Sequence, residues 1–295
     1  MIDAEPSLSD FVAQGWARHA EQARDVAAGL LARAATLSAD ADGAAAIGLA
    51  EHVWLSHLQD TPGLQALLQA LPAAVREAPA SGAMVLRAQW VLATLAGAPA
   101  VPIPDAARWR AQQNLWSVWS ANGRAADALA MLQAELPQAL VHPETAARKA
   151  LAIATHNLAV ELREGRRGDP HRDALMLALA DASRALWAGA GNWVNIERGD
   201  YELARCHAVL GNGQAALQHA RACLALIEQH AGAPEADAFE TFFAHEALAW
   251  AQRAAGDAQG LAAERTRMQQ RLSEVSDAAL KPWCEQALAA LDKAG

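Results

Sequence analysis

Apolar residues recur along this chain at helical spacing, in segments that end where Gly, Pro, Asn and Asp gather. Strand patterns are missing, because no run of alternating β-branched residues lies between turn pairs. The sequence therefore predicts an all-α protein of about a dozen helices. We expect the helices at about 8–36, 44–59, 63–78, 83–97, 105–121, 124–136, 145–164, 171–188, 193–210, 213–230, 238–255, 257–273 and 277–292.

Two series of apolar pairs recur with one period in the later part of the chain. Leu158-Ala159, Leu203-Ala204 and Leu248-Ala249 stand 45 residues apart, and Leu115-Trp116 precedes the first of them by 43. The second series, at steps of 46, 42 and 44 residues, consists of Ala128-Leu129, Ala174-Leu175, Ala216-Leu217 and Gly260-Leu261. Two interleaved series of one period are typical of stacked helical hairpins.

The first hundred residues follow this period poorly. We therefore expect a divergent N-terminal helical segment or cap at residues 1–100, and one continuous array of hairpins at residues 105–295. The segment from Ala98 to Pro104 holds three prolines and is the expected joint. The helix at 277–292 would cap the array, since a terminal unit must present one polar face to water.

Two of the expected hairpins share an order of residues: a Leu pair, a ring residue four positions after the Leu, a Gly turn, and two further apolar positions. They are Leu203-Ala204, His207, Gly211, Ala216 and Ala220, and Leu115-Trp116, Trp119, Gly123, Ala128 and Leu132. In this order the chain resembles the tetratricopeptide repeat over roughly residues 105–273, although its period of about 44 exceeds the repeat's 34 and most of the repeat's aromatics are missing. The resemblance implies a right-handed α-solenoid of antiparallel hairpins, whose first helices line a concave groove for a partner.

Composition narrows the class of protein. The chain is 53% hydrophobic and alanine-rich, and it carries a net charge of −9 without a basic tract, which disfavours nucleic-acid binding. No stretch approaches the roughly 18 apolar residues of a membrane span, and the N-terminus lacks the basic start and apolar core of a signal peptide. Three cysteines form no zinc-finger spacing. We expect a soluble, cytoplasmic protein that does not bind membranes.

Catalytic motifs are missing from the sequence. It contains no Gly-rich phosphate loop, no nucleophile elbow and no Cys/His pair at a recognised catalytic spacing, so we predict no enzyme activity and no cofactor. His245-Glu246 lacks the second histidine of a metalloprotease helix.

Histidine and cysteine positions offer one metal hypothesis. Cys206, His219 and Cys223 would lie near each other if the hairpin folds about Gly211, and thiolate with imidazole suits zinc or copper. We favour packing, because free Cys is commonly a buried apolar residue. His52 and His57 are five residues apart, a poor spacing for one site on a helix. No metal ligand is assigned.

A stripe of side chains on the first helices is the expected binding site. Steps of three or four residues from the Leu anchors bring arginines and aromatics from neighbouring hairpins onto one surface. Arginine forks suit carboxylates, and aromatics suit apolar groups. The alternative is that Arg198 pairs with Glu202 at i,i+4, Arg205 is solvated and the aromatics are core. The expected ligand-binding residues are His156, Asn157, Arg163, Trp193, Arg198, Tyr201, Arg205, Phe243, Glu246 and Trp250.

The function that this pattern favours is a non-catalytic binding module, whose groove takes a peptide or protein partner that carries a carboxylate. A small-molecule sensor, with Trp193, Tyr201, Phe243 and Trp250 around a pocket in the same groove, is the first alternative. A metalloprotein or enzyme that uses Cys206, His219 and Cys223 is a weaker one. A self-assembling, homo-oligomeric role also stays open.

Overall fold

The protein is represented by a computed structural model, in which residues 6–293 are described. Within that range it is helical and contains no strand, which confirms the all-α prediction. The chain divides into two compact units, Met1–Ala125 and Ala126–Gly295. None of the helices in the described range combines the length and the apolar character that a membrane crossing requires.

The first unit is built around α3. This helix packs against α1, α2 and α6, and its side chains Ile47 and Leu49 are fully buried. Helix α7 belongs to this unit, since it packs against α6 and η2. The elements are α1 (Leu8–Arg18), α2 (Ala23–Arg33), η1 (Ala34–Thr36), α3 (Ala41–His52), η2 (Val53–His57), α4 (Thr61–Ala70), α5 (Ala73–Glu77), α6 (Pro79–Leu95) and α7 (Asp105–Ala121).

The η2 segment is a π-helical turn that continues α3. The Leu58 N–H donates to the Val53 carbonyl five residues earlier, at 3.0 Å, instead of to a carbonyl four residues earlier. A π turn holds one residue more than an α turn between bonded groups, so side chains five apart come onto one face. Single π turns of this kind inside helices are frequent at functional sites.

Two of the helices predicted in this unit are broken in the structure. The expected helix at 8–36 is interrupted at 19–22, where α1 gives way to α2, and the sequence there contains neither Gly nor Pro. The expected helix at 63–78 is interrupted at Leu71-Pro72, because Leu71 is extended before the proline and α5 begins only after Pro72, at Ala73.

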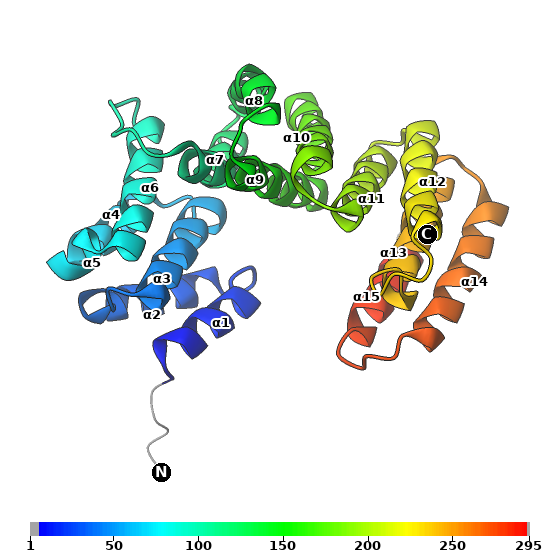
Figure 1. Ribbon diagram of the computed structural model, residues 1–295, viewed down its shortest axis with the longest axis horizontal. Helices are drawn as coiled ribbons and strands as arrows, with labels where there is room; N and C mark the ends of the chain where they lie inside the picture. The colour runs from blue at the N-terminus through cyan, green and yellow to red at the C-terminus, as the bar shows by residue number, and fades with distance from the viewer. Residues whose placement is uncertain (1–5, 294–295) are drawn as a thin grey trace, which may run out of the picture. The chain divides into compact units, whose positions relative to one another are not determined.

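The second unit contains helices that follow the predicted bounds within a few residues. In chain order, α9 packs against α10, α11 against α12, and α13 against α14, and these helices succeed one another in Figure 1. The elements are α8 (Ala125–Leu140), α9 (Thr145–Glu164), α10 (Pro170–Ala190), α11 (Trp193–Val209), α12 (Gly213–Gln229), α13 (Ala238–Ala254), α14 (Ala258–Glu274) and α15 (Lys281–Lys293).

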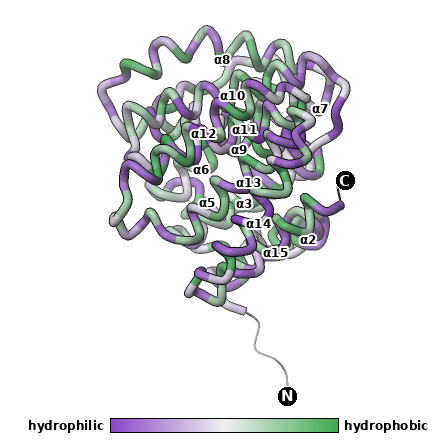
Figure 2. The backbone as a smooth tube through the Cα atoms, turned by 90° about the vertical axis from the view of Figure 1, so that its right-hand side faces the viewer, coloured by the Kyte–Doolittle hydropathy of each residue, from purple (hydrophilic) through white to green (hydrophobic). Residues whose placement is uncertain are grey.

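The recurrent Leu residues are anchors of this packing. Leu158 and Leu203 are fully buried, and Leu248 is 6% exposed. Figure 2 shows hydrophobic and hydrophilic residues alternating along the helices, as expected of helices that bury one side. At the turn after α11, Gly211 adopts a left-handed conformation (φ +74°), which costs glycine least. At Gly213, an added Cβ would lie 2.6 Å from the backbone of Ala255, so α12 begins in close contact with the end of α13.

Candidate functional site

The predicted stripe lies on three helices of the second unit that pack side by side. Helix α11 contacts both α9 and α13, so residues of all three reach one surface (Figure 1). The predicted residues on α9 are His156, Asn157 and Arg163; those on α11 are Trp193, Arg198, Tyr201 and Arg205; and those on α13 are Phe243, Glu246 and Trp250.

Arg205 is the centre of one closely packed cluster. Its Nη1 donates to the Glu246 Oε1 at 2.6 Å and to the Tyr201 hydroxyl at 2.7 Å. Tyr201 in turn donates to the Glu246 Oε2 at 2.6 Å, and the Trp250 indole donates to the same carboxylate at 3.1 Å. The guanidinium carbon lies 4.9 Å from the Trp250 ring centroid, in cation–π contact. Glu246 therefore occupies the position beside Arg205 that we expected a partner's carboxylate to take.

Little of this cluster is exposed to water. The side chains of Arg205 and Glu246 are only 12% and 3% exposed. Burial, and then the negative charge of Glu246, raise the pKa of Tyr201 far above its ordinary value, so the hydroxyl stays a donor. One atom in the cluster is unsatisfied: the Arg205 Nε is buried without a hydrogen-bond partner.

Arg163 makes a second buried ion pair, between α9 and α11. Its Nε donates to the Glu202 Oε1 at 2.7 Å, and the two side chains are 10% and 2% exposed. Burial alone would lower the pKa of Arg163, but the Glu202 carboxylate raises it above its ordinary value. Burial lowers the pKa of His156 beside this pair, and Arg163 and Arg198 lower it further, while Glu202 opposes them. Asn157, the next residue, is half-buried.

Arg198 differs from the other two arginines because its side chain is 56% exposed. It forms an ion pair with Glu240 at the start of α13, and this hydrogen bond raises the pKa of Arg198. The pairing of Arg198 with Glu202, which i,i+4 spacing suggested, is wrong: Glu202 bonds to Arg163 instead. Arg205 is paired as well, and not simply solvated.

The aromatic residues of the stripe pack on more than one core cluster, and Tyr201 shares one of them with Trp193. Phe243 contacts the Tyr201 ring edge to face, with centroids 6.1 Å apart, and packs on the same core cluster as Trp250. Trp193 instead stacks flat on His230 at the end of α12, with centroids 4.5 Å apart, and packs on Cys223 and Ile227. Trp193 and Trp250 therefore lie on different clusters.

Cys206, His219 and Cys223 each contact a different acid. Cys206 donates to Glu202 at 3.4 Å, Cys223 donates to Glu197 at 2.6 Å, and His219 lies 2.9 Å from Asp200. Burial raises the pKa of both thiols well above the ordinary value, which disfavours the thiolate that a metal needs. The structure does not bring these three side chains to one site.

The acids that pair with the arginines were not predicted as their partners, although Glu246 was among the expected residues. The three pairs Arg163–Glu202, Arg205–Glu246 and Arg198–Glu240 join residues 39, 41 and 42 positions apart. These spacings are three to six residues shorter than the 45-residue step of the Leu anchors. An acid three to six residues before the equivalent position in the next hairpin was the signal that could have found them.

Comparison with known proteins adds no relative: no protein-family model matches the chain, and no curated protein is significantly similar to it in sequence.

Proposed function

We propose that the protein is a non-catalytic binding module, which takes a carboxylate-bearing peptide or protein tail along α9, α11 and α13. In this proposal the second unit is a right-handed solenoid of antiparallel hairpins, similar to tetratricopeptide repeats. The observation that carries the proposal is the exposure of Arg198 on the middle helix, beside two arginines that are buried and paired. The three cysteines, all free, agree with an action in the cytoplasm.

The buried pairs would hold the surface in shape. Arg163 ties α11 to α9 through Glu202, and Arg205 ties α11 to α13 through Glu246. A surface fixed in this way loses little conformational freedom when a partner binds, so more of the contact free energy contributes to affinity. In this proposal Arg163 and Arg205 do not contact the partner; they hold α9, α11 and α13 in the arrangement that binds it.

Arg198 is the side chain that would contact the partner. A guanidinium has five N–H donors, and the ion pair with Glu240 uses the Nη2 end. A partner's carboxylate can share the remaining donors without disturbing a buried group. Ile153, 37% exposed on α9, and the half-buried Phe239 on α13 add apolar contacts on the flanking helices. The ligand that fits best has a carboxylate next to an apolar side chain.

Charge reversal at Arg198 tests the proposal. In an Arg198→Glu variant, two carboxylates face the partner's carboxylate, and we expect at least a roughly tenfold loss of affinity, as is common for an arginine at the centre of an interface. Partners are captured from a cell extract with the wild-type chain and identified by mass spectrometry. Their affinities for both chains are then measured by isothermal titration calorimetry.

The matched control is Arg265→Glu on α14, whose side chain is 46% exposed and pairs with Asp292 on α15. This variant changes the net charge by the same amount, away from the stripe, and should bind like the wild type. Equal affinities of both variants for the captured partner would overturn the proposal. A metabolite that quenches tryptophan fluorescence, with no peptide partner captured, would favour the small-molecule sensor instead.

A further inference from the structure

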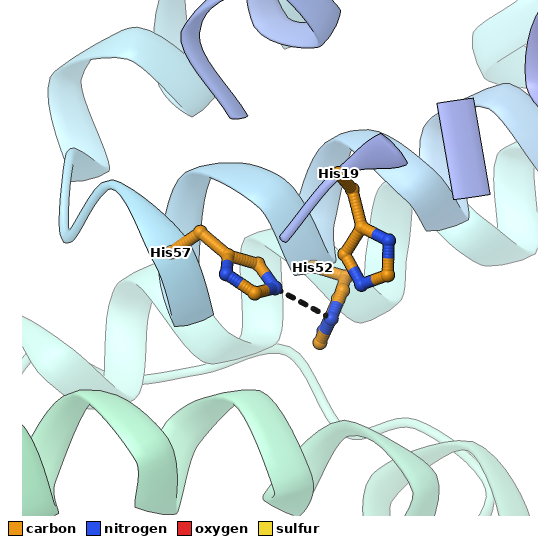
Figure 3. Close-up of side chains that lie close together, drawn as sticks. All are labelled: His19, His52 and His57. Atoms are coloured by element: carbon orange, nitrogen blue, oxygen red, sulfur yellow. Dashed lines mark hydrogen bonds between the residues drawn. The ribbon is translucent and has the colours of Figure 1, made fainter. Parts of the chain in front are cut away.

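Three histidines of the first unit meet at one point. His19 follows the end of α1, His52 ends α3 and His57 ends the η2 turn, and their rings turn toward one another in Figure 3. One ring nitrogen from each lies within 4.8 Å of the other two. Between residues 6 and 293, this is the one group of three potential metal ligands that lie this close together.

The π turn brings His52 and His57 together. On a regular α-helix, residues five apart point in directions about 140° apart, because each residue turns the helix by about 100°. The i→i+5 bonding of η2 removes this offset, and the two Nε2 atoms lie 3.2 Å apart. The expectation that this spacing cannot serve one site is therefore wrong, since it assumed an unbroken α-helix.

Hydrogen bonds fix the tautomers of two of the rings. The Nδ1 of His19 lies 2.6 Å from the Trp16 carbonyl, which can only accept, so this nitrogen carries the proton. The Nδ1 of His52 lies 3.2 Å from the Asn114 Oδ1, which also accepts from Ser56. Both rings therefore direct the lone pair of Nε2 away from these partners. Metal-binding histidines are oriented by such bonds from the second ring nitrogen.

Buried groups hold the amide that orients His52. The Asn114 Nδ2 donates to the Glu51 Oε1 at 2.8 Å, which leaves the Oδ1 side facing His52. Glu51 is fully buried and is held by the Arg87 Nε at 2.7 Å. A chain of four side chains, Arg87, Glu51, Asn114 and His52, thus runs from a buried ion pair to the cluster.

The spacing of the nitrogens suits a tetrahedral metal ion. Zinc binds histidine nitrogen at roughly 2.0–2.1 Å, so two such ligands on a tetrahedral ion lie about 3.4 Å apart. The Nε2 atoms of His52 and His57 are 3.2 Å apart and share a hydrogen bond (Figure 3), a separation close to that value, so an ion would take the place of this proton. His57 is exposed, so its ring is free to complete the geometry by a small rotation.

We propose that His19, His52 and His57 bind one Zn²⁺ ion through three imidazoles, with a water in the fourth position. Nitrogen ligands favour zinc and its late transition-metal neighbours over Mg²⁺ and Ca²⁺, which prefer oxygen. Three protein ligands leave the fourth position of a tetrahedral ion open to water. The site lies in the first unit and is independent of the binding surface proposed on the second.

Titration of the untagged, chelator-treated full chain with Zn²⁺ in a calorimeter tests the proposal. We expect one ion per chain, and a loss of affinity of at least about tenfold in His57→Ala and in His19→Ala. His57 is exposed, so its removal should leave the fold intact, which circular dichroism checks. His171→Ala, an exposed histidine at the start of α10, is the matched control and should bind like the wild type.

Co²⁺ in place of Zn²⁺ gives a second readout, since tetrahedral Co²⁺ absorbs visible light far more strongly than octahedral Co²⁺. A strong visible band in the wild type and the His171→Ala variant, weakened in His57→Ala, is the expected result. Zinc binding that is undetectable at millimolar concentration, or equal in His57→Ala and the wild type, would overturn the proposal. Neither result bears on partner capture by Arg198.

Discussion

Replacing Glu246 by Leu is expected to lower the free energy of unfolding of the second unit by about 3–5 kcal/mol. The change removes the carboxylate that accepts hydrogen bonds from Arg205, Tyr201 and Trp250 while keeping a side chain of similar volume. Arg205 would then be a buried cation without a counter-charge, and a lone charge in a protein interior costs far more than the net worth of the pair. The loss of stability therefore arises from Arg205, which stays buried after its counter-charge is removed.

A second variant separates this cause from a packing defect. In Arg205→Met with Glu246→Leu, no buried charge is left, and apolar groups of similar size often replace a buried pair at little cost. We expect the double variant to recover most of the lost stability. Urea unfolding followed by circular dichroism gives the free energies, and hydrogen exchange of α11 and α13 reports where the loss occurs.

Arg198→Ala is the control for this experiment. Its ion pair with Glu240 is largely exposed on the arginine side, and such pairs contribute about 0–1 kcal/mol. An equal loss in Arg198→Ala and Glu246→Leu, or a double variant no more stable than Glu246→Leu, would contradict the assignment of Arg205 to holding the helices. The experiment therefore also checks that Arg198 can be changed without disturbing the fold.

The helices of the second unit were predictable because their signals are local. Helical spacing of apolar residues, with turn residues between, predicted α9 at 145–164 with the bounds that the structure shows, and α11 at 193–210 within one residue. The Leu anchors added the register, since residues one period apart take equivalent places, and Leu158 and Leu203 are fully buried. Periodicity therefore identified which positions are packed.

In the first unit, the same reasoning missed features that depend on tertiary contacts. No Gly or Pro marks the break at 19–22, and nothing in the letters of 53–57 distinguishes a π turn from an α turn. Both features decide where His19, His52 and His57 point. The five-residue spacing of His52 and His57 did not predict the cluster, because on an α-helix the two side chains would point in different directions, whereas on the π turn they share one face.

The ion-pair partners of the arginines in the predicted stripe could not be predicted from local spacing either. Local spacing favoured Glu202 for Arg198, since the two are four residues apart on one helix. Glu202 is 1% exposed, however, and a buried carboxylate needs a partner that is buried with it. Arg163 on α9 is buried with Glu202 and is that partner. Arg198 extends toward solvent and is not. Burial decides between candidate partners, and burial of a helix face follows from its neighbours.

Glu197 on α11 leads to the second large effect, a dependence of stability on pH. Glu197 is 1% exposed, accepts a hydrogen bond from the Cys223 thiol at 2.6 Å, and has a second oxygen without a partner. Burial raises the pKa of Glu197 to about 7, although the Cys223 hydrogen bond lowers it in part. In the unfolded chain the same carboxyl has a pKa near 4.5.

Because the folded pKa is the higher one, ionisation of Glu197 opposes folding. Below pH 4.5 the group is protonated in both states and contributes nothing. Between 4.5 and 7 the unfolded chain loses the proton first, so stability falls as the pH rises, and above 7 the loss stays constant at about 3 kcal/mol. Glu197→Gln removes the ionisable carboxyl and with it this loss of stability. We expect the variant to be more stable than the wild type at pH 8 by up to that amount, and the gain to vanish near pH 4.

The measurement is the difference in unfolding free energy between Glu197→Gln and the wild type, from urea unfolding at several pH values between 4 and 8. The difference cancels the titration of other groups, which both chains share. Glu228→Gln, an exposed position on α12, makes the same chemical change and should give a difference that does not vary with pH. Cys223→Ser should lower the folded pKa of Glu197, since a hydroxyl is a stronger donor to the ionised carboxylate than a thiol. The pH range over which stability falls should then end at a lower pH. A flat difference for Glu197→Gln would mean that water reaches this carboxylate, and that α11 and α12 pack less closely around it than the structure indicates.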